Sequence, residues 1–408
     1  MSENILQTTL AREPHQNWKL ADINLFLASQ LVMGLTPEPS IENYFQQDSM
    51  GIFGSLWMQE SFSRDKWTEL NQHIHFDTNQ CMQQLRVNIQ QAWNLNQILV
   101  VDEMMRTFTG RWKHIQHVKR KPHNTGLKFY GLTDDSFYLW DFLLYQGEDS
   151  EREHTPTAIV MDFAKSAIKN IFKPHIIVTD SYYGSLNLAL ELDKYKLGCL
   201  LSCKSDRPAF LFSNHLHKDL DKGEFTSINN RHFSAMTYYD KAKVNLITNL
   251  FNTNKTINSQ ENNKTLPLGI YRYRKWLGGL DHFDRWLHLY LIQHKNIKWT
   301  QALFSTLLKI AVNNTNIIAM AMNFSTNLKE TILKIIQHLK GSYSVRQDAN
   351  RPSYQRKRSK LGHFPTLLKS SKDCTHCMNE NKRSKTKYMC DMCKVHLHPA
   401  CWVEYHNK

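Results

Sequence analysis

The 408-residue sequence has few cysteines over most of its length, no long apolar run and no internal repeat. Three of the eight cysteines are scattered before residue 370, which excludes a disulfide framework there. The longest apolar candidate, residues 303–312, is shorter than the ~20 residues of a membrane span and contains Lys309. Residues 1–16 show no basic segment followed by an apolar one, so no secretory signal is expected. We therefore expect a soluble intracellular protein.

The composition supplies a packed core and an excess of positive charge. Hydrophobic residues make up 41% and charged residues 22% of the chain, which excludes wholesale disorder, and the length suggests about two to four folding units. The net charge is +14, and the segment 346–408 alone holds fourteen Lys or Arg against five Asp or Glu. Such a basic end is typical of a protein that binds a polyanion, although a solvated tail explains a charge run equally well.

Hydrophobic spacing predicts a helical N-terminal part and then an alternation of strands and helices. The predicted helices cover residues 17–35, 55–62, 66–74, 155–170, 186–198 and 278–322. The predicted strands cover residues 97–102, two strands around a turn at 134–136, and residues 174–180 and 196–204. This order favours a mixed α/β core, with a site at the carboxyl edge of its sheet.

Three acids stand out by position. Asp102 and Asp180 each follow a short apolar run, and Asp281 follows two glycines at a predicted helix start. They are 78 and 101 residues apart, so only a fold can bring them together. Clustered carboxylates of this kind hold two Mg²⁺ or Mn²⁺ ions about 3.5–4 Å apart for phosphoryl transfer. The alternative is that each Asp is an ordinary turn or helix-capping residue.

The other five cysteines lie within residues 374–401, with histidines between and after them. Ligands two residues apart let one turn point two side chains at one Zn²⁺, which takes four ligands tetrahedrally. We expect two zinc ions in a cross-braced module, with His376 as a spare; the alternative is reduced cysteines in a disordered tail. The first expected ligand set is Cys374, Cys377, His398 and Cys401, and the second is Cys390, Cys393 and His406, with His396 as a further candidate.

Four ordered blocks resemble those of the piggyBac transposase family. The blocks are VDEMMRTFTGR (101–111), KPHNTGLKFYGLTDDSFYLWDFLLYQG (121–147), VTDSYYGSLNLALEL (178–192) and WLGGLDHFDR (276–285). With similar segments upstream and the terminal Cys/His module, the resemblance covers roughly residues 18–408. Arg285 departs from the family, which usually has Gln there, and no acidic N-terminal extension is present.

The resemblance implies an α/β fold: an RNase H-like catalytic core with a helical N-terminal segment, an insertion domain and a small zinc module. It implies a metal-binding catalytic triad of Asp102, Asp180 and Asp281, with Asp284 as a fourth acid. The domains expected are a short N-terminal tail (1–17), a helical dimerisation or DNA-binding segment (18–95), the core (96–204 and 264–340), the insertion domain (205–263), a basic linker (341–372) and the zinc module (373–408).

The activity implied is cut-and-paste transposition through a DNA hairpin, with joining to TTAA targets by a nuclear homodimer. Basic residues would neutralise DNA phosphates: Arg106, Arg111, Lys119, Arg120, Lys121 and Lys128 near the core, and Arg356, Lys357, Arg358 and Lys360 in a basic cluster typical of nuclear localisation. Two alternatives remain at this point. One is a domesticated DNA- or chromatin-binding protein that has lost the reaction, and the other is an RNase H-type nuclease without strand transfer.

Overall fold

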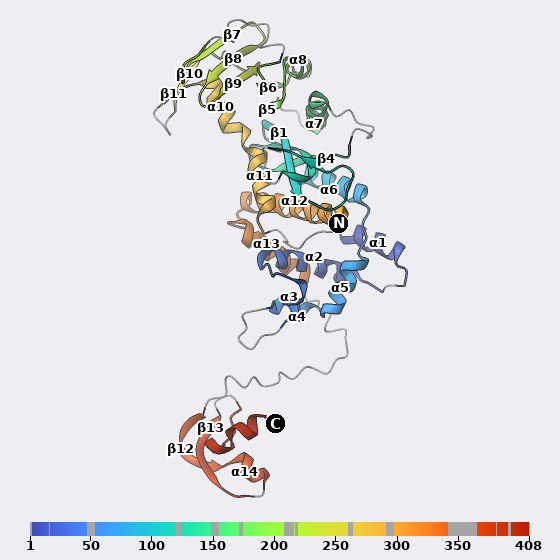
Figure 1. Ribbon diagram of the computed structural model, residues 1–408, viewed down its shortest axis with the longest axis vertical. Coiled ribbons are helices and arrows are strands. Elements are labelled where there is room, and N and C mark those ends of the chain that lie inside the picture. Colours follow the sequence, from blue (N-terminus) through green and yellow to red (C-terminus); the bar gives the residue numbers. More distant parts are fainter. Residues whose placement is uncertain are drawn as a thin grey trace. The chain divides into compact units, whose positions relative to one another are not determined.

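The computed structural model describes residues 2–15, 17–46, 54–119, 124–147, 155–170, 174–207, 216, 219–259, 264–290, 298–341, 365–380, 382–390 and 393–407 (Figure 1). The chain divides into a larger unit, residues 1–45 and 55–344, and a smaller unit, residues 46–54 and 345–408. Among the described residues, no helix combines the length and the apolar content that a membrane span requires.

The larger unit is built on a mixed sheet of nine strands. Its centre is β1 (Ile98–Thr107), which pairs antiparallel with β3 (Thr125–Asp134) and parallel with β5 (Ile176–Gly184). On one side, β3 also pairs with β2 (Gln116–His117) and β4 (Leu139–Leu144); on the other, β5 pairs in parallel with β6 (Gly198–Cys203). This order, β4-β3-β1-β5-β6, is the RNase H-like core that the resemblance implies, so the predicted fold class is confirmed.

Three further strands extend the same sheet beyond β6. They are β7 (Phe225–Asn229), β8 (Ser234–Tyr239) and β9 (Lys243–Thr248), and β9 pairs antiparallel with β6. A separate two-stranded sheet follows, made of β10 (Thr256–Ser259) and β11 (Lys264–Pro267). The segment 205–263, expected as an insertion domain, therefore contributes strands that continue the core sheet through the β6–β9 pairing.

Helices cover both faces of the core. On one face, α7 (Pro156–Asn170) packs against β5 and α8 (Leu186–Lys194) packs against β6. On the other face lie α10 (Leu268–Leu277), which packs on β1 and β5, and α11 (Gly279–His288), which packs on β1 and β3. Strand β1 is buried along nearly its whole length, so both of its faces lie inside the fold. The residues before Asp102 accordingly form a continuous apolar run instead of an alternating one.

The first helices pack with the last helices of the larger unit. The N-terminal ones are α1 (Ser2–Arg12), α2 (Leu20–Leu35), α3 (Ile41–Phe45), α4 (Leu56–Ser61), α5 (Arg64–His73) and α6 (Thr78–Ala92). Of the last two, α12 (Trp299–Ala321) contacts α6, and α13 (Leu328–Lys340) contacts α2. The segment expected as an N-terminal tail forms helix α1, which buries Ile5 and bonds to the chain after α5, because Thr9 Oγ1 donates to the His75 carbonyl at 3.0 Å.

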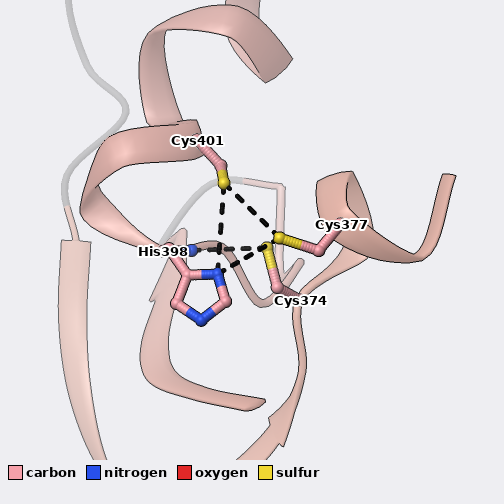
Figure 2. Close-up of side chains that lie close together, drawn as sticks. All are labelled: Cys374, Cys377, His398 and Cys401. Atoms are coloured by element: carbon pink, nitrogen blue, oxygen red, sulfur yellow. Dashed lines mark hydrogen bonds between the residues drawn. The ribbon is translucent and has the colours of Figure 1, made fainter. Parts of the chain in front are cut away.

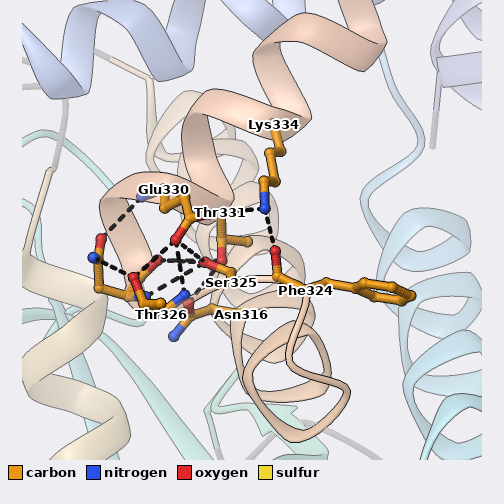
Figure 3. Close-up of polar contacts among 8 residues, drawn as sticks. Asn316, Phe324, Ser325, Thr326, Glu330, Thr331 and Lys334 are labelled. Carbon is orange, nitrogen blue, oxygen red and sulfur yellow. Dashed lines mark hydrogen bonds and ion pairs between the residues drawn. The ribbon is translucent and has the colours of Figure 1, made fainter.

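A polar network fixes the turn between α12 and α13 (Figure 3). The Glu330 carboxylate accepts hydrogen bonds from the backbone N–H and the hydroxyl of Thr326, both at 2.8 Å, and pairs with Lys334 at 2.8 Å. Lys334 and then Thr326 lower the pKa of Glu330 to about 2. Thr331 also donates to Asn316 of α12 at 2.8 Å, so the start of α13 is bound to α12 by side chains as well as by packing.

The smaller unit holds a two-stranded sheet and short helices. Its elements are β12 (Pro365–Asp373), α14 (Thr375–Asn379), β13 (Lys385–Cys390), the 3₁₀ helix η1 (Pro399–Cys401) and α15 (Trp402–Asn407). Strands β12 and β13 pair antiparallel, so β12 begins within the range expected for the basic linker. With so few apolar side chains, this unit depends on its Cys and His residues for a core.

Candidate active site and metal centres

Two of the three predicted acids occupy matching positions on neighbouring strands. The parallel register of β1 and β5 pairs Val101 with Thr179, so Asp102 and Asp180 are the next residue on each strand. Adjacent strands lie about 4.8 Å apart, and residues at matching positions point to the same face. That face also carries Val100 and, on β5, the apolar side chains that α10 covers. The sheet therefore brings together two carboxylates that are 78 residues apart in sequence.

Each of these carboxylates has a local hydrogen bond that limits its orientation. Asp102 is buried, and its Oδ1 accepts from the Glu103 N–H at 2.8 Å. Asp180 is half-buried, and its Oδ1 accepts from the Tyr182 N–H at 3.0 Å. The pairing of β5 with β6 is interrupted between Thr179 and Gly184. Asp180 thus stands in the middle of β5, at the point where the strand leaves its regular ladder with β6.

Tyr273 on helix α10 is influenced by both carboxylates. Burial raises the pKa of Tyr273 on α10 above its usual value, and the negative charges of Asp180 and Asp102 raise it further. The Tyr273 side chain also lies near Ser202 of β6, which lowers its pKa. One phenol on α10 therefore feels the first two predicted acids together, which supports their convergence on this face of the sheet.

The other two acids lie on helix α11. The helix starts at Gly279, where an added Cβ would come within 2.9 Å of Thr133 Oγ1 and 3.4 Å of the Asp134 carbonyl of β3. This close approach requires glycine and fixes the first turn against the sheet. Asp281 is exposed in that turn, and Asp284 is half-buried one turn later, with its Oδ1 3.8 Å from His288 Nε2. The helix that packs on the strand of Asp102 therefore carries both Asp281 and Asp284.

The far end of α11 is held by residues that the sequence interpretation did not assign. Lys309 of α12 is 5% exposed, and its ammonium donates to the carbonyls of Leu289 at 2.6 Å and Tyr290 at 3.4 Å. His288 Nε2 lies 3.1 Å from the Met105 carbonyl of β1. Burial and then the nearby positive charge of Arg106 lower the pKa of Lys309 to about 8. The signal was present in the sequence, because Lys309 interrupts an otherwise apolar helical run.

The predicted phosphate-binding residues fall into three groups. Arg111 and Lys119 are exposed. Arg106 is half-buried, and its Nη2 donates to Ser305 Oγ at 3.3 Å; burial lowers its pKa. Lys128 is 8% exposed and pairs with the buried Glu103 at 3.2 Å, which places its charge inside the fold. The remaining residues lie outside the described ones: Arg120, Lys121, Arg356, Lys357, Arg358 and Lys360.

The smaller unit brings together the four residues of the first expected zinc set (Figure 2). Cys377 Sγ lies 3.7 Å from Cys401 Sγ and 3.5 Å from His398 Nδ1, and Cys374 Sγ accepts a hydrogen bond from the His398 backbone N–H at 3.4 Å. Two Zn–S bonds of ~2.3 Å at the tetrahedral angle place their sulfurs about 3.8 Å apart. The donor atoms therefore already have the spacing of a tetrahedral Cys₃His zinc site.

These thiols influence one another's protonation. Burial, and then the neighbouring sulfurs of Cys377 and Cys374, raise the pKa of Cys401 to about 12. Burial also acts to raise the pKa of Cys374, but hydrogen bonds from Cys377 and His398 outweigh it and lower that pKa to about 7. One thiol of the set is therefore about half ionised at pH 7, and a metal ion would displace protons from the others.

A second group holds three of the remaining expected ligands. Cys390, Cys393 and His406 have donor atoms within 4.8 Å of one another, and Cys393 Sγ lies 3.7 Å from His406 Nε2. His396 is not part of that group. Its Nδ1 is buried with no hydrogen-bond partner among the described residues. His376, expected as a spare, pairs with Glu380 at 3.3 Å and Glu404 at 3.1 Å, and so links α14 to α15.

Comparison with known proteins defines the class of this protein. The family model described as Transposase IS4 matches residues 1–316, more than three quarters of the chain. The protein therefore belongs to this transposase family, whose members are DNA-cleaving enzymes. A search of curated proteins gave no match.

The particular fold is that of a piggyBac transposase. The cryo-EM structure of a piggyBac transposase synaptic complex with hairpin DNA superposes with a TM-score of 0.74 at 17% sequence identity. The match covers 98% of this chain and 94% of that chain. The family and fold inferred from the sequence blocks are thereby confirmed.

Proposed function

We propose that this protein is an active piggyBac-type transposase, which excises DNA by metal-dependent cleavage and joins it to TTAA targets. The observation that carries the proposal is the placement of Asp102 and Asp180 at matching positions on β1 and β5, directly after the last paired residues of the two strands. Two like charges at neighbouring positions repel each other unless a cation lies between them. Carboxylates brought together from distant parts of a chain are therefore a feature of metal-dependent catalysis.

The donor set suits hard divalent ions. Asp102, Asp180 and Asp281 offer carboxylate oxygens, which are the ligands that Mg²⁺ and Mn²⁺ prefer. Two bound ions would activate the attacking oxygen and stabilise the leaving oxygen in an in-line displacement. Asp284 lies three residues after Asp281, on the same side of α11. In our proposal the β1–β5 edge holds the first two acids, and α11 brings the third and fourth to them.

The reaction follows as a series of phosphodiester exchanges at one centre. Water attacks a phosphodiester at the transposon end, and the bond to the 3′ oxygen breaks to leave a 3′-hydroxyl. That hydroxyl attacks the opposite strand, releases the flanking DNA and closes a hairpin. Water then opens the hairpin, and the freed 3′-hydroxyl attacks a phosphodiester at a TTAA target. The similar solved complex contains hairpin DNA, which supports this order of steps.

The remaining parts of the protein serve DNA binding in this proposal. Arg111 and Lys119 are exposed and contact phosphates, together with the basic residues of the segment 346–360. The two Cys/His groups hold one zinc ion each, and the smaller unit they stabilise binds the transposon end. The protein acts as a homodimer in the nucleus.

The test is cleavage of duplexes that carry the inverted repeats and TTAA sites flanking the gene. With Mg²⁺ or Mn²⁺, the wild-type protein should produce nicks and hairpins, and Asp180→Asn and Asp281→Asn should produce neither. Asp162→Asn is a matched control, because Asp162 is an exposed acid on α7, on the opposite face of the sheet. Salt-sensitive binding without any product from the wild type would contradict the enzyme and favour a domesticated DNA-binding protein.

A further inference from the structure

Lys128 and Glu103 form a buried ion pair directly behind the candidate active site. Glu103 follows Asp102 on β1, so its side chain points to the opposite face of the sheet. Its carboxylate lies 3.2 Å from the Lys128 ammonium of β3, and the two side chains are only 11% and 10% exposed. Both charges are therefore removed from water, which is costly unless the pair has a specific use.

Two tyrosine rings enclose the same ammonium. Lys128 Nζ lies 4.7 Å from the ring centroid of Tyr130 and 5.1 Å from that of Tyr182. Tyr130 stands opposite Glu103 in the β1–β3 register, so it belongs to the strand pair. Tyr182 comes from β5, beyond the point where that strand leaves its ladder. A desolvated cation attracts the face of each ring, so Lys128 binds three strands together.

Two residues that contact Lys128, Tyr182 and Glu103, are hydrogen-bonded to the two candidate metal ligands. The backbone N–H of Tyr182 donates to Asp180 Oδ1 at 3.0 Å, and that of Glu103 donates to Asp102 Oδ1 at 2.8 Å. The position of Lys128 thus influences the backbone groups that orient each carboxylate. Contacts that orient metal ligands typically change metal affinity about 10–100-fold when they are lost.

We propose that Lys128 and Glu103 are positioning residues that set the separation of Asp102 and Asp180 and thereby the metal affinity of the active site. Lys128 then has no direct contact with DNA. This inference rests on the proposed function, because it requires that the two Asp carboxylates bind metal.

The test measures Mn²⁺ affinity by titration calorimetry, alongside thermal unfolding and DNA binding. Lys128→Met alone removes one charge of a buried ion pair and so endangers the fold. The double variant Lys128→Met/Glu103→Gln removes both charges, and pairs replaced in this way are often neutral for stability. Tyr182→Leu removes one ring and leaves the ion pair in place. Lys194→Met is the matched control, since Lys194 pairs with Glu191 at 2.6 Å on the exposed side of α8.

We expect the double variant to bind Mn²⁺ about 10–100-fold more weakly and Tyr182→Leu to bind it several-fold more weakly, with unfolding midpoints and DNA affinity near wild type. Unchanged Mn²⁺ affinity in both variants would overturn the proposal. The proposal would also be overturned if the double variant bound DNA more weakly and the salt dependence of its DNA binding fell by about one released ion. That result is expected if Lys128 contacts a phosphate. Equal Mn²⁺ binding by the wild type and Asp180→Asn would instead reject the metal centre, and the proposed function with it.

Discussion

Replacing Lys309 with Met tests how helix α11 is held in place. Lys309 is 5% exposed, donates to the carbonyls of Leu289 and Tyr290, and has Arg106 and His288 as its titratable neighbours. Burial lowers its pKa from 10.5 to about 8. At pH 7 the folded protein therefore holds a charged ammonium at a cost, which the difference between these two pKa values sets at roughly 3 kcal/mol.

The sign of the pH dependence follows from this lowered pKa. Between pH 8 and 10.5 the unfolded chain binds more protons at Lys309 than the folded protein does, so the stability contributed by this group rises with pH. The two pKa values give a gain of about 2 kcal/mol between pH 7 and pH 9.5. Cys199 and Cys203, whose pKa values burial raises to about 12, act in the opposite direction, so only a difference between variants isolates the lysine.

The assay is urea unfolding of the wild type and Lys309→Met at pH 7.0 and 9.5, followed by circular dichroism. From pH 7.0 to pH 9.5, the free energy of unfolding of the wild type should rise by about 2 kcal/mol relative to that of the variant. Because Met cannot donate to the two carbonyls at the end of α11, we also expect slower DNA cleavage by the variant. A difference in stability that is the same at both pH values would refute the argument.

Three further predictions concern single contacts. Arg86→Met should lower the free energy of unfolding by about 3 kcal/mol in urea, because it removes a two-bond ion pair (2.6 and 2.9 Å) to Asp141, which is 1% exposed; an unchanged midpoint would contradict this. Gly279→Ala should slow cleavage about 10–100-fold by lifting α11 from the sheet, whereas Gly278→Ala, whose added Cβ would meet only His282 at 3.7 Å, should not; equal rates would exclude this role for the close approach. Purified protein should contain two zinc ions, and Cys374→Ser should lose the ion of the first ligand set and lower the stability of the smaller unit; full zinc content in that variant would show that the ligand set is different.

Elements with strong local patterns were predictable from the sequence. The apolar runs before Asp102 and Asp180 indicated strands, and they form β1 and β5. The turn at residues 134–136 joins β3 to β4, and the helical spacing of residues 155–170 corresponds to α7, which begins one residue later. Spacing also grouped the first zinc ligand set, because ligands two residues apart on one turn leave few arrangements that place four donors around one ion.

Features that depend on strand register were not predictable. Lys128 was predicted to neutralise DNA phosphates, and the β1–β3 pairing that places it beside Glu103 in the interior could not be foreseen. The strands of residues 225–248 lie in the expected insertion domain, and the pairing of β9 with β6, which joins them to the core sheet, could not be foreseen either. Residues 278–322 were predicted as one helical region, whereas α11 ends at His288 and α12 begins at Trp299. Lys309 of α12 donates a hydrogen bond to the Leu289 carbonyl, directly after the end of α11. All three features depend on contacts between residues that are far apart in the sequence.

The most direct test of a single metal-dependent centre is a metal-specificity switch at Asp180. Asp180→Cys replaces a hard oxygen ligand with a softer thiolate, which binds Mn²⁺ better than it binds Mg²⁺. We predict that this variant does not cleave the transposon-end duplex in Mg²⁺ and regains nicking and hairpin formation in Mn²⁺, while Asp180→Asn stays inactive in both. Cleavage by Asp180→Cys in Mg²⁺ at the wild-type rate would contradict the account, because the carboxylate would then not be a metal ligand.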